Sequence, residues 1–352
     1  MTLVTDPTAP RIAVVGATGA VGSTLIELIE ERALAYREIH LVASTRSAGR
    51  RLAVDGLSYA VQALEEFDFG RADIAFFSAG TSVSQEWAGT AAAQGALVID
   101  NTNAFRMDPK TPLVVPQVNG EVLETRPVNG LIANPNCSTI PLVRLLQTVE
   151  RRWGIRQVVT STYQSASGKG HRGIEELLEG SEVALRDPDA ELPAESFRPA
   201  LAFNVVPFID ELLDSGFTLE EQKMLQESRK ILGIPHLDLT ATCVRVPVVN
   251  CHAESVWVEA GSPVAREELI TLLSALPEVT VHDAEDRAAF PTPLTAGNPD
   301  HVHVGRVRVA PHNPRGFWMW VVSDNLRVGA ALNAVQIAEY ALRHGFMSGG
   351  TR

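Results

Sequence analysis

The sequence predicts an α/β protein of two domains: an N-terminal Rossmann-like, doubly wound parallel sheet and a C-terminal α+β domain with a mostly antiparallel sheet. Two patterns predict this division. Up to about residue 152, short apolar strands alternate with amphipathic helices, which is typical of a parallel sheet with helices on both faces. Beyond that point, strands are separated by long connections with few helices, as in an antiparallel sheet. A chain of 352 residues is also long for one hydrophobic core.

The N-terminal elements follow from short apolar runs and helical periodicity. Residues 1–10 are expected to form a flexible tail, and residues 11–136 a dinucleotide-binding domain. We expect strands at 11–15, 39–43, 74–77, 97–99 and 130–133, and helices at 23–34 and 85–94.

The second domain is expected to span residues 137–325. A last, alanine-rich helix at 326–343 is expected to pack back onto the first domain, and residues 187–199 to form an exposed loop. We expect strands at 158–163, 240–246, 254–258, 302–309 and 318–323, and helices at 140–149, 220–232 and 266–273.

Composition excludes several classes of protein. Lys plus Arg number 30 against 42 Asp plus Glu, so the net charge of −12 argues against a nucleic-acid binder. No apolar run reaches the roughly 18 residues that span a bilayer, and residues 1–10 lack the apolar core of a signal peptide. Three cysteines do not make a disulfide framework, so we expect a protein of the reducing cytoplasm.

A glycine-rich turn links the first strand to the first helix. Gly16, Gly19 and Gly22 follow the strand directly, in a G-x-x-G-x-x-G spacing rather than the standard G-x-G-x-x-G. Such a turn lets the backbone approach a pyrophosphate, which the N–H groups at the start of the helix then bind. The turn predicts a dinucleotide site, with a plain tight turn as the alternative.

The end of the second strand indicates which dinucleotide binds. An NAD site would place Asp or Glu there to accept a hydrogen bond from the ribose 2′-hydroxyl. The sequence instead reads Ala43-Ser-Thr-Arg-Ser47. Arg46 can pair with a 2′-phosphate and Ser47 can donate to it, so NADP is predicted. An ordinary solvated arginine is the alternative reading of Arg46.

Cys137 is the strongest candidate for a nucleophile. It lies in Asn134-Pro-Asn-Cys-Ser-Thr139, between a strand and the helix at 140–149, where the helix dipole favours thiolate over thiol. We expect the hydroxyls of Ser138 and Thr139 to cap this helix. A thiolate here can attack an aldehyde or an acyl phosphate.

The other two cysteines lie in hydrophobic, strand-like sequence and are expected to be buried structural residues. A zinc site built from Cys243, Cys251 and His252 lacks the paired close spacing of zinc ligands, and none is predicted.

Taken together, the motifs resemble those of the bacterial aspartate-semialdehyde dehydrogenases, in the family's order and over nearly the whole chain from Arg11 onward. The resemblance departs at Phe208, where many relatives carry a histidine. The matching motifs are Gly16–Gly22, Arg46–Gly49, Asn134–Thr139, Thr162–Gly168, Phe203–Pro207, Glu220–Met224, Arg245–His252 and Ser323–Arg327.

This resemblance implies NADPH-dependent reduction of aspartyl 4-phosphate to aspartate 4-semialdehyde and phosphate, a step toward lysine, threonine and methionine. It implies a thioester on Cys137, a catalytic and dimerisation role for the second domain, and a homodimer.

The resemblance also implies a role for each matching residue. Cys137 would be the nucleophile, His252 the general acid/base and Gln164 the residue that orients the substrate. Glu220 would hold the substrate amino group and Arg245 its α-carboxylate, while Arg106 and Lys223 would bind the phosphate. A weak i, i+3 ion pair is the alternative explanation of Glu220 and Lys223. Asn136 would also contact the substrate. The implied cofactor contacts are Gly16, Thr18, Gly19, Ala20, Val21, Arg46, Ser47, Ser78, Ser167, Gly168 and Asn325.

Three alternatives stay open. N-acetyl-glutamyl-phosphate reductases share the thioester logic but carry their cysteine in a Pro-Gly-Cys-Tyr-Pro context, and glyceraldehyde-3-phosphate dehydrogenases carry theirs in Ser-Cys-Thr-Thr-Asn. The acetylated substrate of the former would need no ion pair to Glu220. A non-catalytic NADP-binding regulatory protein is the third, and the joint presence of Cys137, Gln164, Arg245 and His252 argues against it.

Overall fold

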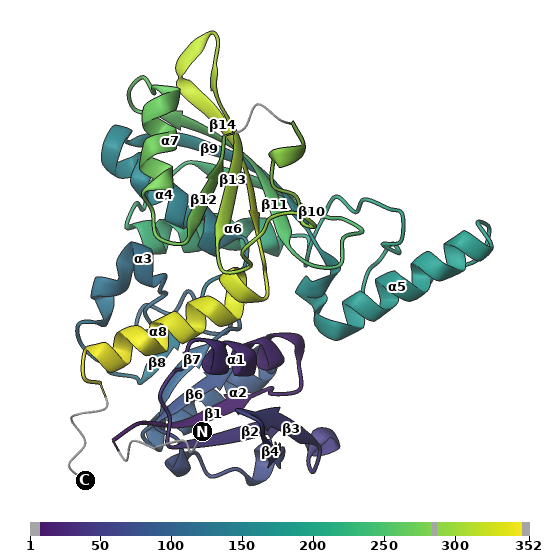
Figure 1. Ribbon diagram of the computed structural model, residues 1–352, viewed down its shortest axis with the longest axis vertical. Helices are drawn as coiled ribbons and strands as arrows, with labels where there is room; N and C mark the ends of the chain where they lie inside the picture. The colour runs from purple at the N-terminus through teal and green to yellow at the C-terminus, as the bar shows by residue number, and fades with distance from the viewer. Residues whose placement is uncertain (1–7, 284–286, 347–352) are drawn as a thin grey trace. The chain divides into compact units, whose positions relative to one another are not determined.

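The computed structural model describes residues 8–283 and 287–346 (Figure 1). The chain divides into two compact units. The first comprises Met1–Pro135 and Ala330–Arg352, and the second comprises Asn136–Gly329. In the described part of the predicted tail, Ala9 and Pro10 are buried, and the Pro10 carbonyl accepts a hydrogen bond from the Arg37 amide. Residues 1–7 of that tail lie outside the described residues.

The first unit is built on a six-stranded sheet in the order β5-β2-β1-β6-β7-β8, and every neighbouring pair is parallel. The strand order reverses between β1 and β6, which is where doubly wound sheets bind ligands at the carboxyl ends of their strands. This sheet confirms the predicted Rossmann-like architecture. Its elements are β1 (Arg11–Val15), α1 (Ala20–Glu31), β2 (Glu38–Ala43), β5 (Gln62–Ala63), β6 (Ile74–Phe77), α2 (Thr81–Ala93), β7 (Leu97–Asp100), α3 (Pro116–Asn119) and β8 (Leu131–Ala133), with a small hairpin of β3 (Arg51–Val54) and β4 (Leu57–Ala60).

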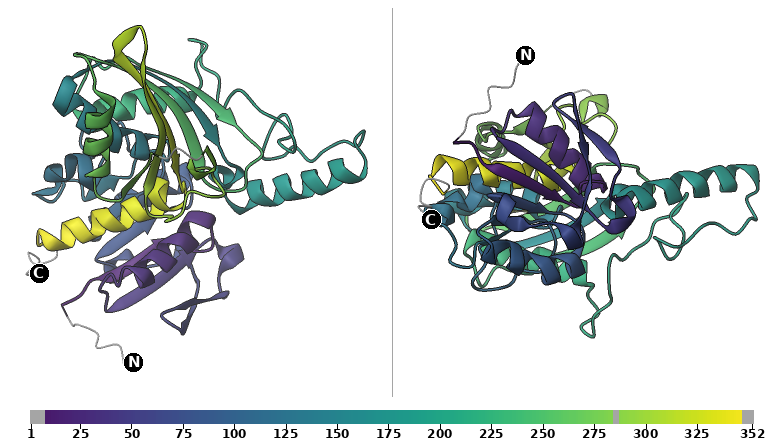
Figure 2. Two further views of the ribbon diagram at one scale, coloured as in Figure 1. Left: turned by 45° about the horizontal axis from the view of Figure 1, so that its top comes forward. Right: turned by 90° about the horizontal axis from the view of Figure 1, so that it is seen from below.

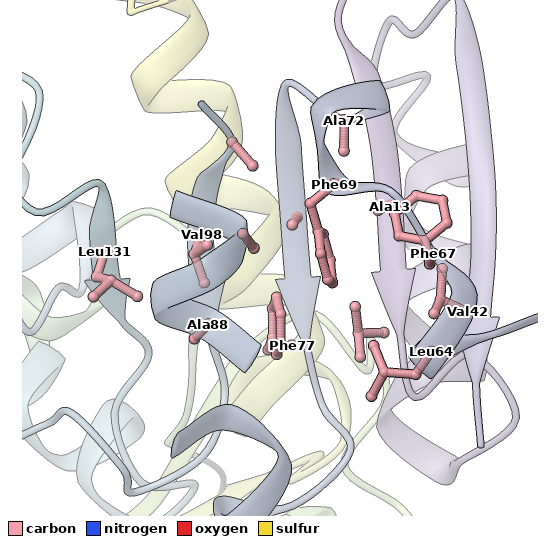
Figure 3. Close-up of a cluster of buried hydrophobic side chains, with 14 residues drawn as sticks. Ala13, Val42, Leu64, Phe67, Phe69, Ala72, Phe77, Ala88, Val98 and Leu131 are labelled. Atoms are coloured by element: carbon pink, nitrogen blue, oxygen red, sulfur yellow. The ribbon is translucent and has the colours of Figure 1, made fainter. Parts of the chain in front are cut away.

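Aromatic and small side chains fill one face of this sheet. Phe69 stacks on Phe77 with ring centroids 5.7 Å apart, and Phe67 meets Phe69 edge-on at 5.1 Å. Ala13 of β1 and Val98 of β7, the strands on either side of β6, belong to the same cluster (Figure 3). Burial of these side chains holds the strands in the register that places their carboxyl ends together.

The C-terminal segment differs from the single helix predicted at 326–343. A π-helical turn, Arg327–Ala331, comes first, and the α-helix α8 spans only Leu332–Arg343. α8 belongs to the first unit and packs against α1, where the Arg32 guanidinium pairs with the Glu339 carboxylate at 2.7 Å.

The second unit contains a six-stranded sheet in the order β10-β9-β11-β14-β13-β12. Its three central pairings are antiparallel and its two outer ones are parallel, which confirms a mostly antiparallel sheet. The strands are β9 (Ile155–Gln164), β10 (Leu239–Arg245), β11 (His252–Ala260), β12 (Val279–His282), β13 (Val302–Ala310) and β14 (Asn313–Ser323). The helices α4 (Thr139–Trp153), α6 (Leu219–Leu232) and α7 (Arg266–Ser274) pack against this sheet.

The sequence did not predict the helix α5, Gly170–Arg186, which projects away from the sheet of its own unit (Figures 1 and 2). A small hydrophobic cluster, including Leu177, Phe197 and Leu201, joins the middle of α5 to the segment that follows it. The predicted loop at 187–199 is this segment, and Phe197 within it is buried. Among the described residues, no helix is long and apolar enough to cross a membrane.

Candidate active site

The glycine-rich turn lies at the carboxyl end of β1, beside the end of β6. Gly16 has a φ of +88°, and a Cβ built on it would lie 2.8 Å from the carbonyl carbon of Ser78, so glycine is required there. α1 begins after Gly19 without a side-chain cap and without an acidic residue in its first turn. Its first N–H groups are therefore suited to an anionic ligand such as a pyrophosphate. Of the predicted cofactor residues, Gly16, Thr18, Gly19, Ala20, Val21 and Ser78 all lie at this turn or at the end of β6.

Arg46 and Ser47 follow β2 in a short 3-10 turn, Thr45–Ser47. The Arg46 side chain is exposed and Ser47 is buried. The structure also brings Glu65 to this turn, because its carboxylate accepts a hydrogen bond from the Thr45 hydroxyl at 3.0 Å. An acid is thus present near the strand end, although the local sequence contains none.

Arg106 also belongs to the first unit, where its buried guanidinium is held by backbone carbonyls. Its Nε donates to the Asn134 carbonyl at 2.9 Å, and a terminal nitrogen donates to the Asn101 carbonyl at 3.0 Å. These bonds fix the orientation of the Arg106 side chain, which is predicted to bind the substrate phosphate.

Cys137 is half-buried and lies two residues before α4. The predicted capping by Ser138 and Thr139 is wrong: neither hydroxyl has a partner among the described residues. Asn136 performs this task instead, since its Oδ1 accepts from the Ser138 amide at 2.9 Å and its carbonyl accepts from the Thr139 amide at 3.0 Å. Behind the cysteine, a Cβ built on Gly329 would lie 2.7 Å from Cys137 Cβ, so the close contact requires glycine.

Glu220 connects three of the predicted substrate residues. Its Oε1 accepts from Asn136 Nδ2 at 2.9 Å and from Gln164 Nε2 at 3.2 Å. Its Oε2 lies 3.4 Å from Lys223 Nζ, so the i, i+3 ion pair considered from the sequence is present. Lys223 also pairs with Asp210 at 2.5 Å, and this pairing lowers the pKa of the Asp210 carboxyl against the opposing effect of burial.

His252 is buried at the start of β11, and its surroundings define its protonation state. Its Nδ1 accepts a hydrogen bond from the Ser165 backbone amide at 3.1 Å. Because a backbone N–H can only donate, the neutral ring carries its proton on Nε2. Nε2 has no partner among the described residues. Burial, and then the charge of Arg245, hold the pKa of His252 well below its ordinary value, so the ring is neutral near pH 7.

Arg245 lies beside His252. A Cβ built on Gly168 would be 2.8 Å from Arg245 Nη1 and 3.6 Å from His252 Nε2, so the three residues adjoin one another. The Nη1 group donates to the Ser165 carbonyl at 2.7 Å, and the guanidinium lies 5.6 Å from the ring centroid of Phe197. Burial lowers the pKa of Arg245, while the charges of Cys137 and Glu220 raise it. The interaction with Cys137 places a positive charge near the candidate nucleophile.

Ser167 and Asn325 join the network around His252. The Ser165 hydroxyl lies 3.1 Å from His252 Nδ1 and donates to Asn325 Oδ1 at 3.0 Å. Asn325 Nδ2 donates to the Ser167 hydroxyl at 2.9 Å. Ser165, which the sequence analysis did not single out, is thus the central residue of this network, and its place between Gln164 and Ser167 in a matching motif was the available signal.

The predicted site residues fall into two sets. The second unit holds Asn136, Cys137, Gln164, Ser167, Gly168, Glu220, Lys223, Arg245, His252 and Asn325. The first unit holds Gly16, Thr18, Gly19, Ala20, Val21, Arg46, Ser47, Ser78 and Arg106.

Glu254 is an additional buried acid, on the same strand as His252 and two residues beyond it. It is 1% exposed, neither carboxylate oxygen has a partner among the described residues, and burial raises the pKa of this carboxyl to about 8. In the register of the sheet it lies between Thr162 and Val321. It is therefore protonated at neutral pH.

Cys243 is buried in β10 as predicted, whereas Cys251 is only half-buried and lies just before β11 rather than within a strand. Burial raises the pKa of both the Cys243 and the Cys251 thiols, so neither is suited to act as a thiolate near pH 7. Within the described ranges, no group of three or more His, Cys, Asp or Glu side chains could hold a metal ion.

Comparison with known proteins identifies this arrangement. Residues 11–126 match the family model described as semialdehyde dehydrogenase, NAD binding domain, and residues 146–328 match semialdehyde dehydrogenase, dimerisation domain. The aspartate-semialdehyde dehydrogenase of Aquifex aeolicus is 45% identical over 96% of this chain and 99% of its own length.

Two solved structures extend the comparison. Aspartate semialdehyde dehydrogenase II of Vibrio cholerae, complexed with ASA, has a TM-score of 0.92 at 42% identity and covers 95% of this chain and 98% of its own. The Candida albicans enzyme, solved with NADP, has a TM-score of 0.74 at 26% identity and covers 96% and 99%. The chain belongs to the aspartate-semialdehyde dehydrogenase family of enzymes.

Proposed function

We propose that this enzyme reduces L-aspartyl 4-phosphate to L-aspartate 4-semialdehyde with NADPH, through a thioester on Cys137, in the route to lysine, threonine and methionine. One observation carries the proposal: the side chain of Asn136, the residue before Cys137, donates a hydrogen bond to Glu220. Glu220 in turn accepts a hydrogen bond from Gln164 and forms an ion pair with Lys223. A nucleophile and the charges that fit an amino-acid substrate are thus linked within one unit.

The residues divide the work as follows. Cys137 Sγ bonds to the acyl carbon, and the bond from that carbon to the phosphate oxygen breaks, so phosphate leaves with the electron pair. When bound, NADPH supplies the hydride that reduces the thioester carbon. The C–S bond then breaks, which returns the thiolate and releases the aldehyde.

His252 acts on the oxygen that becomes negatively charged. Its Nε2–H donates a hydrogen bond to that oxygen and can exchange a proton with it. Arg245 pairs with the α-carboxylate and Glu220 with the α-amino group of the substrate. Arg106 and Lys223 bind the phosphate. A free amino group on the substrate can pair with the buried Glu220 carboxylate, whereas an acetylated amine carries no charge to pair with it.

The direct test is NADPH formation from aspartate 4-semialdehyde, with and without inorganic phosphate. N-acetyl-glutamate semialdehyde is assayed in parallel. We expect phosphate-dependent activity with the unacetylated aldehyde alone. Activity with only the acetylated aldehyde would transfer the chain to the rival reductases, and absence of both activities in protein that binds NADPH would favour a regulatory role.

We propose NADP as the cofactor, with Arg46 and Ser47 at its 2′-phosphate. The NADP complex of the Candida albicans relative and the exposed guanidinium at the end of β2 support this assignment. Arg46→Ala should weaken NADP binding about 10- to 100-fold, because a charge-assisted contact contributes about 1.5–3 kcal/mol, and should leave NAD binding within about threefold. Fluorescence titration of both cofactors measures this, with the exposed Arg126→Ala as control. Equal losses for NADP and NAD would refute the assignment.

We also propose a homodimer, formed through the sheet face of the second unit that lacks a covering helix. Alternate residues of β9 show the two faces: Val158, Thr160 and Thr162 are buried, whereas Val159 and Tyr163 are 41% and 37% exposed. On this exposed face Trp257 packs on Trp318 with centroids 4.2 Å apart, and the matching family model is described as a dimerisation domain. Such an apolar face suits a second copy of the chain.

Sedimentation should therefore give about twice the 38.0 kDa chain mass. Val159→Asp, which places a charge on this face, should shift the protein to the monomer at micromolar concentration. Val128→Asp is the matched control, because Val128 is fully exposed in the first unit. Unchanged association of the Val159 variant would show that the dimer uses another surface.

A further inference from the structure

Two carboxylates of α6 hold Asn136, the residue before the candidate nucleophile. Glu220 accepts from the Asn136 side-chain amide at 2.9 Å, and Glu227 accepts from the Asn136 backbone amide at 2.7 Å. The two acids are seven residues apart, so they lie on one face of the helix, two turns from each other. Glu220 is 6% exposed and Glu227 is 1% exposed.

These contacts account for every polar group of Asn136. Its backbone amide and its Nδ2 donate to α6, while its Oδ1 and its carbonyl accept from the first amides of α4. Asn136 therefore ties the start of α4 to α6. Since Cys137 is the next residue, this tie sets where its thiol lies relative to the N-terminus of α4.

Burial of the Glu227 carboxylate makes a purely space-filling role unfavourable. A charged group that is almost completely buried costs free energy unless hydrogen bonds compensate it, and an apolar side chain would fill the same volume without that cost. One compensating contact is a 2.7 Å, charge-assisted bond from a backbone amide of the nucleophile loop.

We infer that Glu227 is the positioning residue of the nucleophile: by fixing the Asn136 amide, it keeps Cys137 at the α4 N-terminus. This inference rests on the proposed role of Cys137. Glu227 itself touches neither substrate nor cofactor in this account, so its replacement should lower kcat and leave KM nearly unchanged.

The test compares Glu227→Ala with Glu227→Gln in the full-length enzyme. The glutamine oxygen can still accept from the Asn136 amide, whereas alanine leaves that amide unbonded. We expect Glu227→Ala to lower kcat at least tenfold, with KM for aspartate 4-semialdehyde within threefold of wild type. Glu227→Gln should retain at least a third of the wild-type kcat.

A second readout needs no turnover. The rate of Cys137 alkylation by iodoacetamide at pH 7, followed by peptide mass mapping, should fall at least fivefold in Glu227→Ala and stay within twofold of wild type in Glu227→Gln. Ser228→Ala is the matched control, because it removes a fully buried hydroxyl from the next position of α6. We expect its alkylation rate to equal that of wild type.

The outcomes separate the two claims. Alkylation and kcat unchanged in a folded Glu227→Ala protein would overturn the inference, as would a Gln variant that is as impaired as the Ala variant. If Ala does not fold, the retained kcat and alkylation of the Gln variant decide the matter. Failure of the proposed function appears instead in the wild-type assay, where no phosphate-dependent activity would be seen while the alkylation comparison stays valid.

Discussion

Cys137→Ala is expected to abolish phosphate-dependent NADPH formation, with at least a 1,000-fold loss of kcat. Without the thiol no thioester can form, and no other described cysteine can replace it, because burial raises the pKa of both Cys243 and Cys251. NADP binding should stay within about twofold of wild type, since the glycine turn belongs to the other unit.

Stopped-flow absorbance at the NADPH band and a cofactor titration on the same preparation measure both quantities. Cys251→Ala is the control, because it removes a half-buried thiol next to His252 and should keep most of the activity. Turnover above about one hundredth of wild type in the Cys137 variant would contradict the thioester assignment.

Glu254→Gln is expected to stabilise the protein at alkaline pH and to have little effect at acidic pH. The carboxyl has an ordinary pKa of 4.5 and a folded-state pKa of about 8. Between these values the folded protein holds a proton that the unfolded chain has released, so the stability contributed by this group is present below pH 4.5 and is lost as the pH rises to 8. Glutamine has a similar shape and no charge to bury.

The difference in free energy of unfolding between variant and wild type should therefore grow by roughly 3.5 kcal/mol from pH 5 to pH 8. The slope reaches about 1.4 kcal/mol per pH unit between the two pKa values and is smaller near each of them. Urea denaturation followed by tryptophan fluorescence measures it. Glu259→Gln is the matched control, because Glu259 lies on the same strand with its side chain 31% exposed. The same difference at both pH values would show that Glu254 is ionised in the folded state.

The sequence predicted most of the strands because their burial is continuous or strictly alternating, and both patterns are local. It missed α5 for a local reason as well. Gly170, Gly173 and Gly180 lower the helix propensity of that segment, and its buried stripe is narrow. The packing of Leu177 against Phe197 accounts for the helix. These two residues are too far apart in the chain for a local sequence pattern to reveal the contact.

Site residues that lie in recognisable motifs were predictable from the sequence. Contacts between residues that are far apart in the chain were not. The capping of α4 was misassigned because the Asn136 carbonyl accepts from the Thr139 and Ile140 amides and Pro141 has no N–H. The hydroxyls of Ser138 and Thr139 therefore have no such role. Glu227 carried one usable signal, its spacing of seven residues from Glu220. The burial of Glu254 depends on which face of the sheet the helices cover, and no local sequence pattern predicts that.

In the proposed reaction an acyl group is carried on Cys137, and a single-turnover experiment tests this most directly. Enzyme, NADP and aspartate 4-semialdehyde are mixed without phosphate, and the protein is quenched and mapped. We expect a burst of one NADPH per active site, an acyl group on Cys137 alone, and renewed NADPH formation when phosphate is added. Steady NADPH formation without phosphate or burst, or an acyl group on another residue, would contradict it.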